Sequence, residues 1–494
     1  MHFAKTRSQN SLTTQHIRPR PPASGSCFAH SMTTSPALLD LSQAARRLRR
    51  AIAPRFALLS NFHNLWHRGS AWLIGPLLVG LMAVGLAKGA EYAAGLNRQL
   101  CNLNPLAPLL FMPAGFALLV YLGRRFFPGS QGSGIPQTIA AINAPGKEKS
   151  SHLLSLRIAM GKAALTLAGL LFGASIGREG PTVQIGASIM HAFQGRGPFK
   201  RESTRRILIL AGGAAGIAAA FNTPLAGIMF AIEELSKKHV FNANSSTLVT
   251  VILSGLISLA LLGNYTYFGT SNASLEWQYS ILPIMVCGVA GGLCGGLFSK
   301  LVISTPTRLP SRMSAWVSRR PLAFAALCGF GVALLGFATG GLIFGTGYDA
   351  TKLTLEDGIL LPWYFSLAKL VATLLCSVSG MAGGIFAPSL AVGAGIGEDI
   401  ALLLPHLAPH SAIILLVMAA YLSGVTRAPV TSFIIMMEMT GSHDMLLPLM
   451  TASVIATASS KLICRPQLYH TLADRFVFPV RPVLHESKGG IPID

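Results

Sequence analysis

The chain has 494 residues, of which 51% are hydrophobic and only 12% are charged, and its mean hydropathy is +0.54. This composition excludes a soluble globular protein and indicates an integral, multi-pass membrane protein. The formal net charge of +21 would suit a nucleic-acid-binding protein. However, the basic residues gather in loops between apolar runs, which is the positive-inside bias of membrane proteins, and we expect no nucleic-acid partner.

The seven cysteines are scattered along the chain, and none belongs to a C-x-x-C pair. The sequence therefore predicts neither a disulfide framework nor a zinc site. We expect no metal and no cofactor.

The first segment, residues 1–70, is basic and rich in serine and arginine, and Asp40 is its only acid. The stretch 37–58 is predicted to form an amphipathic helix on the cytoplasmic face, and a transit peptide is the alternative. The apolar runs that follow predict membrane spans, many of them interrupted by glycine or proline. These runs are 71–87, 105–122, 207–232, 248–263, 281–299, 321–346, 364–379, 384–404 and 445–463.

The charged loops predict the orientation of the spans. With the basic N-terminus in the cytoplasm, the weakly charged connection that holds Glu91 and Arg98 lies outside. The arginine-rich loop at 308–320 lies inside, and the acid-leaning loop that begins with Asp349 lies outside. The second half of the chain therefore starts from the opposite side to the first.

The adjacent residues Arg178 and Glu179 interrupt an apolar stretch at 172–190. Ionisable groups at membrane depth are costly, so they usually face a cavity or an ion path rather than lipid. Gly177 and Pro181 favour a helix, a break, and a second helix whose free amides point back into the break, where they attract anions. A short surface turn between two membrane helices is the alternative.

The sequence also repeats itself after roughly two hundred residues. Two copies that start from opposite sides predict an inverted repeat, 71–265 and 266–465, with a short cytoplasmic tail at 466–494. Such repeats are typical of transporters, whose substrate lies near the midplane where broken helices meet. The matching positions are Gly177, Pro181 and Gly186 with Gly384, Pro388 and Gly393, and later Gly216, Pro224 and Glu233 with Gly424, Pro429 and Glu438.

Three glycine- and proline-rich signatures followed by a tyrosine resemble those of the CLC family of chloride channels and chloride/proton antiporters. The resemblance covers about residues 70–480. It implies an all-α fold of two inverted repeats with broken and tilted helices, and a homodimer with a separate pathway in each subunit. The signatures are Gly132-Ser133-Gly134-Ile135-Pro136, Gly177-Arg178-Glu179-Gly180-Pro181 and Gly383-Gly384-Ile385-Phe386-Ala387-Pro388, and the tyrosine is Tyr469.

By this resemblance, two hydroxyls and several backbone amides bind a central chloride. Partial dipoles suit such a site, because the ion must be held and then released. The residues alone leave alternatives open, namely a capping serine in a helix break and a tyrosine at the membrane interface. The hydroxyls are those of Ser133 and Tyr469, and the main-chain contributors are Ile385, Phe386, Gly134 and Gly180.

Two cations are expected to make the pathway electrostatically positive. Arg178 belongs to the second signature, and a structural ion pair is its alternative role. Lys162 resembles a family lysine that contributes positive field, and its alternative is a side chain that extends to the membrane interface. Ser133 favours chloride over nitrate, since nitrate-preferring relatives tend to have proline there. Gln137 stands where glutamate is frequent, which puts a local acidic contact in doubt but not chloride binding.

Two acids resemble the family's proton-handling residues. Glu179 corresponds to the gating glutamate, whose carboxylate competes with chloride and moves away when protonated. Glu234 corresponds to the internal proton-transfer glutamate of the antiporters, which channel members generally lack. From spacing alone, Glu234 could equally be a charged helix end at the interface. Glu438 is expected to be structural.

These expectations favour a secondary-active chloride/proton antiporter in a bacterial inner membrane, with both termini in the cytoplasm. Its partners would be chloride, protons and the lipid bilayer. A passive voltage- or pH-gated chloride channel of the same fold is the alternative. An enzyme is not expected, because the single G-x-S-x-G match around Ser175 lies in membrane sequence with no histidine or acid partner nearby. No phosphate loop is present, which argues against an ATP-driven pump.

Overall fold

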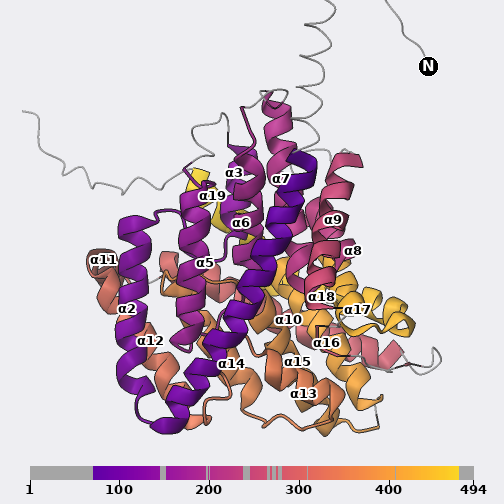
Figure 1. Cartoon of the computed structure of the whole chain (residues 1–494). Helices are drawn as coiled ribbons and strands as arrows, with labels where there is room; N and C mark the ends of the chain where they lie inside the picture. Colours follow the sequence, from indigo (N-terminus) through magenta and orange to yellow (C-terminus); the bar gives the residue numbers. More distant parts are fainter. Residues whose placement is uncertain are drawn as a thin grey trace, which may run out of the picture. The chain divides into compact units, whose positions relative to one another are not determined.

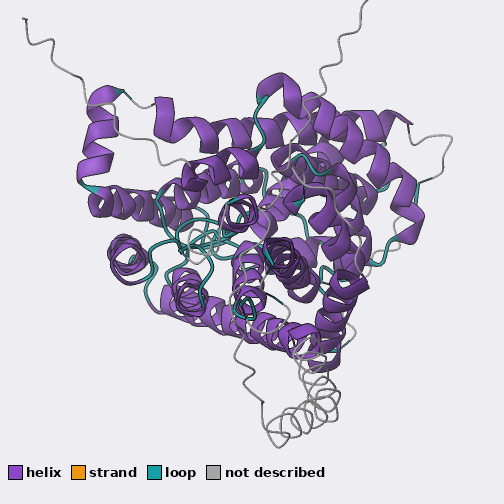
Figure 2. Cartoon of the chain, turned by 90° about the horizontal axis from the view of Figure 1, so that it is seen from above, coloured by secondary structure: helices purple, strands orange, loops and turns teal. Residues whose placement is uncertain are grey.

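The computed structural model describes residues 71–144, 152–195, 199, 201–236, 245–263, 267–269, 274–275, 281–308, 310–406 and 408–477. The amphipathic helix predicted over 37–58 lies outside these residues. The described residues form helices, the loops between them and two isolated β-bridges, so the fold is all-α as expected (Figure 1). A view from above shows some helices end-on and others lying across the view, as tilted and broken helices do (Figure 2).

The first half begins with a long helix, Ala71–Leu103. The helices that follow are α2 (Pro108–Phe126), α3 (Ile135–Asn143), α5 (Leu156–Leu171), α6 (Glu179–His191), α7 (Glu202–Phe221), α8 (Pro224–Phe230), the π-helical η1 (Ala231–Leu235) and α9 (Ser245–Leu262).

The second half repeats this arrangement with its own helices and ends on a short helix near the C-terminus. They are α10 (Ile281–Arg308), α11 (Ser311–Arg319), α12 (Pro321–Ala338), α13 (Tyr348–Glu356), α14 (Phe365–Val378), α15 (Phe386–Leu403), α16 (His410–Thr426), α17 (Pro429–Thr440), η3 (His443–Met445), α18 (Leu446–Ile463) and α19 (Leu468–Val477).

Seven of the described helices are long and apolar enough to cross a membrane, and each overlaps a predicted apolar run. Large apolar side chains such as Leu110, Leu327 and Leu462 are strongly exposed on these helices. In water this exposure would be unfavourable, whereas lipid is a suitable environment for such faces. The protein is therefore an integral, multi-pass membrane protein.

Two predicted spans differ from the structure because helix-ending residues interrupt them. The run 207–232 is broken between α7 and α8, where Asn222 adopts a left-handed conformation with φ of 59°. Pro224 then begins α8, a position that suits a residue without an amide hydrogen. The run 321–346 ends as a helix at Ala338 and continues as a glycine-rich loop.

The repeat is visible in a pair of equivalent lysine contacts. In each half, a buried lysine donates to two carbonyls of the glycine-rich loop that precedes a short helix. These lysines are Lys162 of α5, beside the loop before α3, and Lys369 of α14, beside the loop before α13. The acceptors are Ser130 (2.8 Å) and Gly132 for the first lysine, and Ile343 (2.8 Å) and Gly345 (2.8 Å) for the second.

A second pair of contacts joins the two halves directly. The carboxylate of Glu233, in η1, accepts hydrogen bonds from the backbone amide of Thr431 at 2.8 Å, at the start of α17. The carboxylate of Glu438, near the end of α17, accepts from the amide of Ala226 at 2.8 Å, at the start of α8. Each half thus caps the N-terminus of the other half's helix, where a negative charge is favourable.

The tail predicted over 466–494 begins with α19, which packs against α3 inside the body of the protein. Leu468 and Tyr469 are fully buried there. Apolar residues at the start of this segment explain its burial, because leaving them in water would forfeit their transfer free energy. Residues 478–494 lie outside the described part of the chain.

We predict that Glu233→Ala and Glu438→Ala each lower the stability of the protein by about 1–2 kcal/mol, because each removes a helix cap. The measurement is thermal unfolding of the purified protein in detergent. Glu356→Ala is the matched control, since that side chain forms only a partly exposed ion pair with Lys352. Equal melting temperatures for all three variants would contradict the capping role.

Candidate functional site

Three breaks in the helices meet inside the protein. The amide of Gly177 donates to the carbonyl of Gly384 at 2.7 Å, and the amide of Gly384 donates back at 2.8 Å. The amide of Gly132 donates to the carbonyl of Met381 at 2.8 Å. These bonds bring together the N-terminal ends of α3, α6 and α15, whose first amides have no partner within their own helices.

Glycine permits this close approach. Gly134, the residue before α3, has φ of +106°, and a Cβ there would lie 2.6 Å from the carbonyl oxygen of Gly180. A Cβ on Gly180 would lie 2.8 Å from the carbonyl oxygen of Ser133. Gly134 and Gly180, both predicted as site residues, are therefore required for the loops before α3 and α6 to touch.

The hydroxyls of Ser133 and Tyr469 lie next to each other at this meeting point. Both are buried, and neither makes a hydrogen bond of good geometry with the described residues. Buried hydroxyls nearly always have a partner, so this pair is suited to a ligand that accepts hydrogen bonds. Tyr469 is fully buried in the protein, so it does not face lipid or water as an interfacial tyrosine would.

Ile385 and Phe386 lie where the sequence predicts them, at the first turn of α15. Both side chains are buried in apolar packing, and the Phe386 ring stacks on Tyr469 with centroids 6.1 Å apart and planes 6° apart. Their amides belong to the open end of the helix, which favours an anion. The structure thus brings four of the predicted chloride-site residues together, namely Ser133, Tyr469, Ile385 and Phe386.

Glu179 is the first residue of α6 and is fully buried. The Tyr267 hydroxyl donates to its Oε1 at 3.4 Å, and the backbone amide of Ala387 in α15 faces the same carboxyl group. This carboxyl group therefore lies between the N-termini of two facing helices, which is a position for an anion. The burial of Glu179 excludes the surface turn considered from sequence.

Both predicted cations lie near the site. Arg178 is buried, with its guanidinium carbon 5.5 Å from the centre of the Tyr267 ring, a cation–π distance. Lys162 is fully buried, and its ammonium group donates to Ser130 at 2.8 Å and to Gly132. Lys162 does not extend to the interface, so that alternative is wrong, and its charge lies directly behind the loop that carries Ser133.

Gln137 has a structural role in the same loop. Its side-chain oxygen accepts from the amide of Gly134 at 3.1 Å, and its nitrogen donates to the carbonyl of Gly129 at 3.3 Å. An amide side chain can make both bonds at once, because it carries a donor and an acceptor. The residue that departs from the family pattern therefore holds the Ser133 loop in place.

Glu234 is fully buried in the π-helical segment η1. Its Oε1 lies 3.7 Å from Nε2 of His470, and the same nitrogen lies 3.1 Å from the Glu234 carbonyl oxygen. The burial excludes a charged helix end in contact with the interface. Single-turn π-helices occur often at functional sites.

His470 is a candidate residue that the sequence analysis missed. It follows Tyr469 directly in α19, so one short helix places a phenol beside Ser133 and an imidazole beside Glu234. Its adjacency to Tyr469 was the available signal. Its contact with Glu234 spans 236 positions of the chain and could not be derived from local pattern.

The possible nucleophile Ser175 has a structural partner. Its hydroxyl lies 2.9 Å from the hydroxyl of Thr373 in α14, and both are buried. The contact holds the loop before α6 against the second half of the chain. A hydrolase would need a histidine at this position of the hydrogen-bond network.

Comparisons with known proteins agree with this fold. A family model described as voltage gated chloride channel matches residues 115–461. The chain is similar to a slow cyanobacterial Cl-/H+ antiporter, with 24% identity and a TM-score of 0.70 over 82% of this chain and 97% of that one. It is similar to a CLC-type fluoride/proton antiporter, with 23% identity and a TM-score of 0.69 over 82% of this chain and 97% of that one.

A third solved structure, a eukaryotic CLC transporter, is similar with 21% identity and a TM-score of 0.64. The match covers 83% of this chain and 74% of that one. At these identities the likeness to solved structures establishes the fold.

We predict that Gly134→Ala disrupts the site, because the new Cβ would collide with the Gly180 carbonyl in addition to the usual left-handed strain. The control is Gly132→Ala, where φ is +68° and a Cβ would meet open space. That control costs only the backbone strain of about 1–2 kcal/mol. The measurement is monodisperse yield and melting temperature in detergent, and equal losses in both variants would contradict the close-approach interpretation.

Proposed function

The chain belongs to the CLC family of voltage-gated chloride channels, and from this premise we propose that it is a secondary-active chloride/proton antiporter. The family consists of transporters and channels, so the open question is whether chloride movement is coupled to protons. The proposal includes a homodimer with a separate pathway in each subunit, located in a bacterial inner membrane with both termini in the cytoplasm. The resemblance of the three signatures and Tyr469 supports these points.

The observation that carries the proposal is the position of Glu179. Its carboxyl group lies at the N-termini of α6 and α15, beside the amide of Ala387 and the hydroxyl of Tyr267. An ionised carboxylate in this position occupies the place of an anion. A proton on that carboxylate removes its charge, so the helix ends then favour a chloride ion instead. Competition between the two anions couples the proton to chloride.

Chloride itself would be held between the two halves by weak donors. The hydroxyls of Ser133 and Tyr469 point into the site without other well-formed hydrogen bonds, and the amides at the start of α15 lie beside them. Lys162 adds a positive field from behind the Ser133 loop. Hydrogen-bond donors without a full charge in direct contact allow the ion to bind and to leave.

The proton would reach the site from the other side of Tyr469. Glu234 is buried beside His470, and both Glu234 and Glu179 lie within electrostatic reach of the Tyr469 hydroxyl. Glu234 can accept a proton from the cytoplasmic side and pass it on towards Glu179, while chloride moves in the opposite direction. A buried acid in this place supports exchange over passive conduction, because a chloride channel has no use for it.

The similar solved structures include two antiporters, one for chloride and one for fluoride. They support exchange as the reaction. A passive chloride channel of the same fold is the second candidate. Flux measurements distinguish the candidates, since only an exchanger moves protons against their gradient when a halide gradient is the sole energy source.

We predict that liposomes containing the protein take up or release protons uphill when only a chloride gradient is applied, and that Glu179→Ala abolishes this while chloride flux persists. The reason is that alanine leaves the anion position but removes the group that carries the proton. Glu179→Gln, which keeps the volume of the side chain, should behave alike. The same measurement with a fluoride gradient in place of the chloride gradient tests whether the protein also exchanges fluoride for protons. Proton pumping by either variant would refute the role of Glu179, and no proton movement by the wild-type protein would favour a channel.

We predict that Glu234→Gln also uncouples protons, with chloride flux retained, because glutamine fills the buried position without a titratable group. The same liposome assay measures it. Glu233→Gln is the matched control, since that neighbouring side chain caps α17 and does not contact His470. If Glu234→Gln and Glu233→Gln couple protons equally well, protons reach Glu179 by a route that does not use Glu234.

A further inference from the structure

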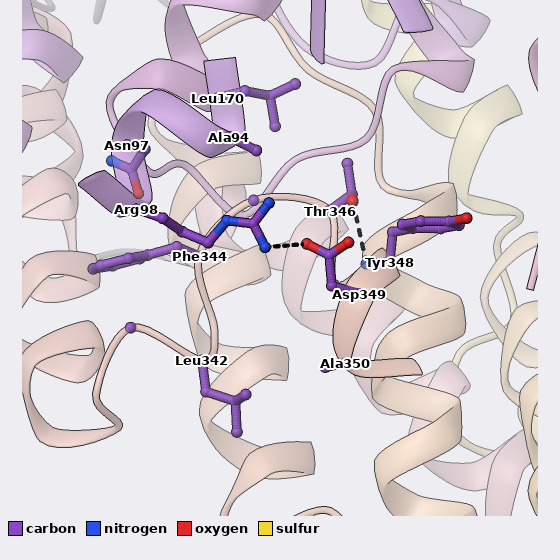
Figure 3. Close-up of a pocket in the computed structure, with 13 residues that line it drawn as sticks. Ala94, Asn97, Arg98, Leu170, Leu342, Phe344, Thr346, Tyr348, Asp349 and Ala350 are labelled. Atoms are coloured by element: carbon purple, nitrogen blue, oxygen red, sulfur yellow. Dashed lines mark hydrogen bonds and ion pairs between the residues drawn. The ribbon is translucent and has the colours of Figure 1, made fainter. Parts of the chain in front are cut away.

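A cavity of about 140 Å³ lies beside the site, in a part of the molecule that the proposed mechanism does not use. The end of the helix Ala71–Leu103, the loop at 341–347 and the start of α13 form its walls (Figure 3). A second cavity of about 80 Å³ shares Arg98, Tyr348 and Asp349 with the first and extends to Arg178 and Tyr267. We call the two cavities together the outer chamber.

An ion pair between the two repeats lies in the outer chamber. Nη1 of Arg98, from the first repeat, is 2.6 Å from Oδ2 of Asp349, from the second (Figure 3). The side chains are 60% and 56% exposed, so both charges are accessible to ions from solution. The sequence predicts both residues in loops on the outer side of the membrane. In the structure they lie in helices instead, Arg98 near the end of Ala71–Leu103 and Asp349 in α13, and the two side chains are in contact.

The wall of the outer chamber resembles the loop that carries Ser133. Gly345-Thr346-Gly347 precedes α13 as Gly132-Ser133-Gly134 precedes α3, and Gly347 and Gly134 both have positive φ, +83° and +106°. Lys369 is fully buried behind this wall and donates to the carbonyl of Gly345 at 2.8 Å. Among the described residues, no carboxylate forms an ion pair with Lys369, so its charge adds to the potential of the chamber.

The inner end of the outer chamber leads to Glu179. The ring of Tyr348 packs against the ring of Tyr267 with centroids 4.9 Å apart, and the Tyr267 hydroxyl donates to Glu179. Arg178 lies over the same Tyr267 ring. Among the described residues, the positive groups around the chamber include Arg98, Arg178, Lys369 and Lys352, which lies beside Tyr348, and the negative groups include Asp349 and Glu91.

We propose that the outer chamber receives the transported halide on the outer side and that Asp349 competes with this halide for Arg98. The inference rests on the proposed function, since it concerns the same pathway. An anion that arrives from outside meets the exposed guanidinium of Arg98, which Asp349 already neutralises in part. Two positive charges further in, Arg178 and Lys369, then favour its movement towards the site. The strength of the Arg98–Asp349 pair thus sets the apparent affinity for outer chloride.

The test uses the full chain inserted in one orientation in liposomes, with initial chloride flux measured against the outer chloride concentration. Arg98→Gln should raise the half-saturating outer chloride by about two- to fivefold, as expected for one charge removed near a solvated ion. Asp349→Asn should lower it by a similar factor. Maximal flux and the half-saturating inner chloride should stay unchanged. Added gluconate salt should reduce both effects, because exposed charges are screened.

Arg320→Gln is the control, because it removes an exposed positive charge at the start of α12, at a position that does not line the chamber. It should leave the half-saturating outer chloride unchanged. If Arg98→Gln and Asp349→Asn shift this value in the same direction, or if neither shifts it, the pair is only a link between the repeats and the inference is overturned. If Arg98→Gln fails to fold, Asp349→Asn and its salt dependence decide. Absence of flux in the wild-type protein would refute the proposed function instead.

Discussion

Two backbone hydrogen bonds between Gly177 and Gly384 hold the N-termini of α6 and α15 face to face, and the site depends on this contact. Within a membrane, backbone groups outside helices are tolerated only where they are buried in protein or line an ionic path. Each half of the chain supplies one helix break, and a backbone amide and a carbonyl of each break form hydrogen bonds with those of the other break. The first amides of α6 and α15 have no partner within their own helices, and they lie close together at this contact. These amides carry partial positive charge, so the uncharged backbone attracts an anion there.

The glutamates of the protein illustrate how position decides the chemistry of one residue type. Glu233 and Glu438 accept hydrogen bonds from helix amides, so their charges are satisfied and hold the halves together. Glu234 follows Glu233 directly, yet it lies beside His470 in the interior. Glu179 lies at the meeting point of two helix ends. The positions of Glu233 and Glu438 suit a structural role, and the positions of Glu234 and Glu179 suit the proposed transfer of protons.

Glycine, proline and charge patterns predicted the breaks at 132–136, 177–181 and 383–388, because these residues act on the local backbone wherever they occur. They also predicted the inverted repeat, whereas the roles of Ser133, Tyr469 and the other residues that meet at its centre were predicted from the resemblance to the CLC family. The contacts of His470 with Glu234 and of Arg98 with Asp349 could not be predicted, since they join positions 236 and 251 residues apart. The hydropathy of 207–232 predicts a single span for another reason, namely that the long apolar stretches on both sides outweigh the helix-ending residues Asn222 and Pro224.

The crossed caps have a consequence for how such a chain can arise and persist. Because Glu233 completes a helix of the second half and Glu438 completes a helix of the first, either half alone would leave a carboxylate without its amide donors and a helix end without its cap. The halves are therefore mutually dependent, like the subunits of an obligate dimer that have been fused into one polypeptide. After duplication of an ancestor with this contact, the loops of the two copies could diverge, as the outer chamber and the Ser133 loop have done. The crossed caps of Glu233 and Glu438 would meanwhile keep the two copies packed against each other.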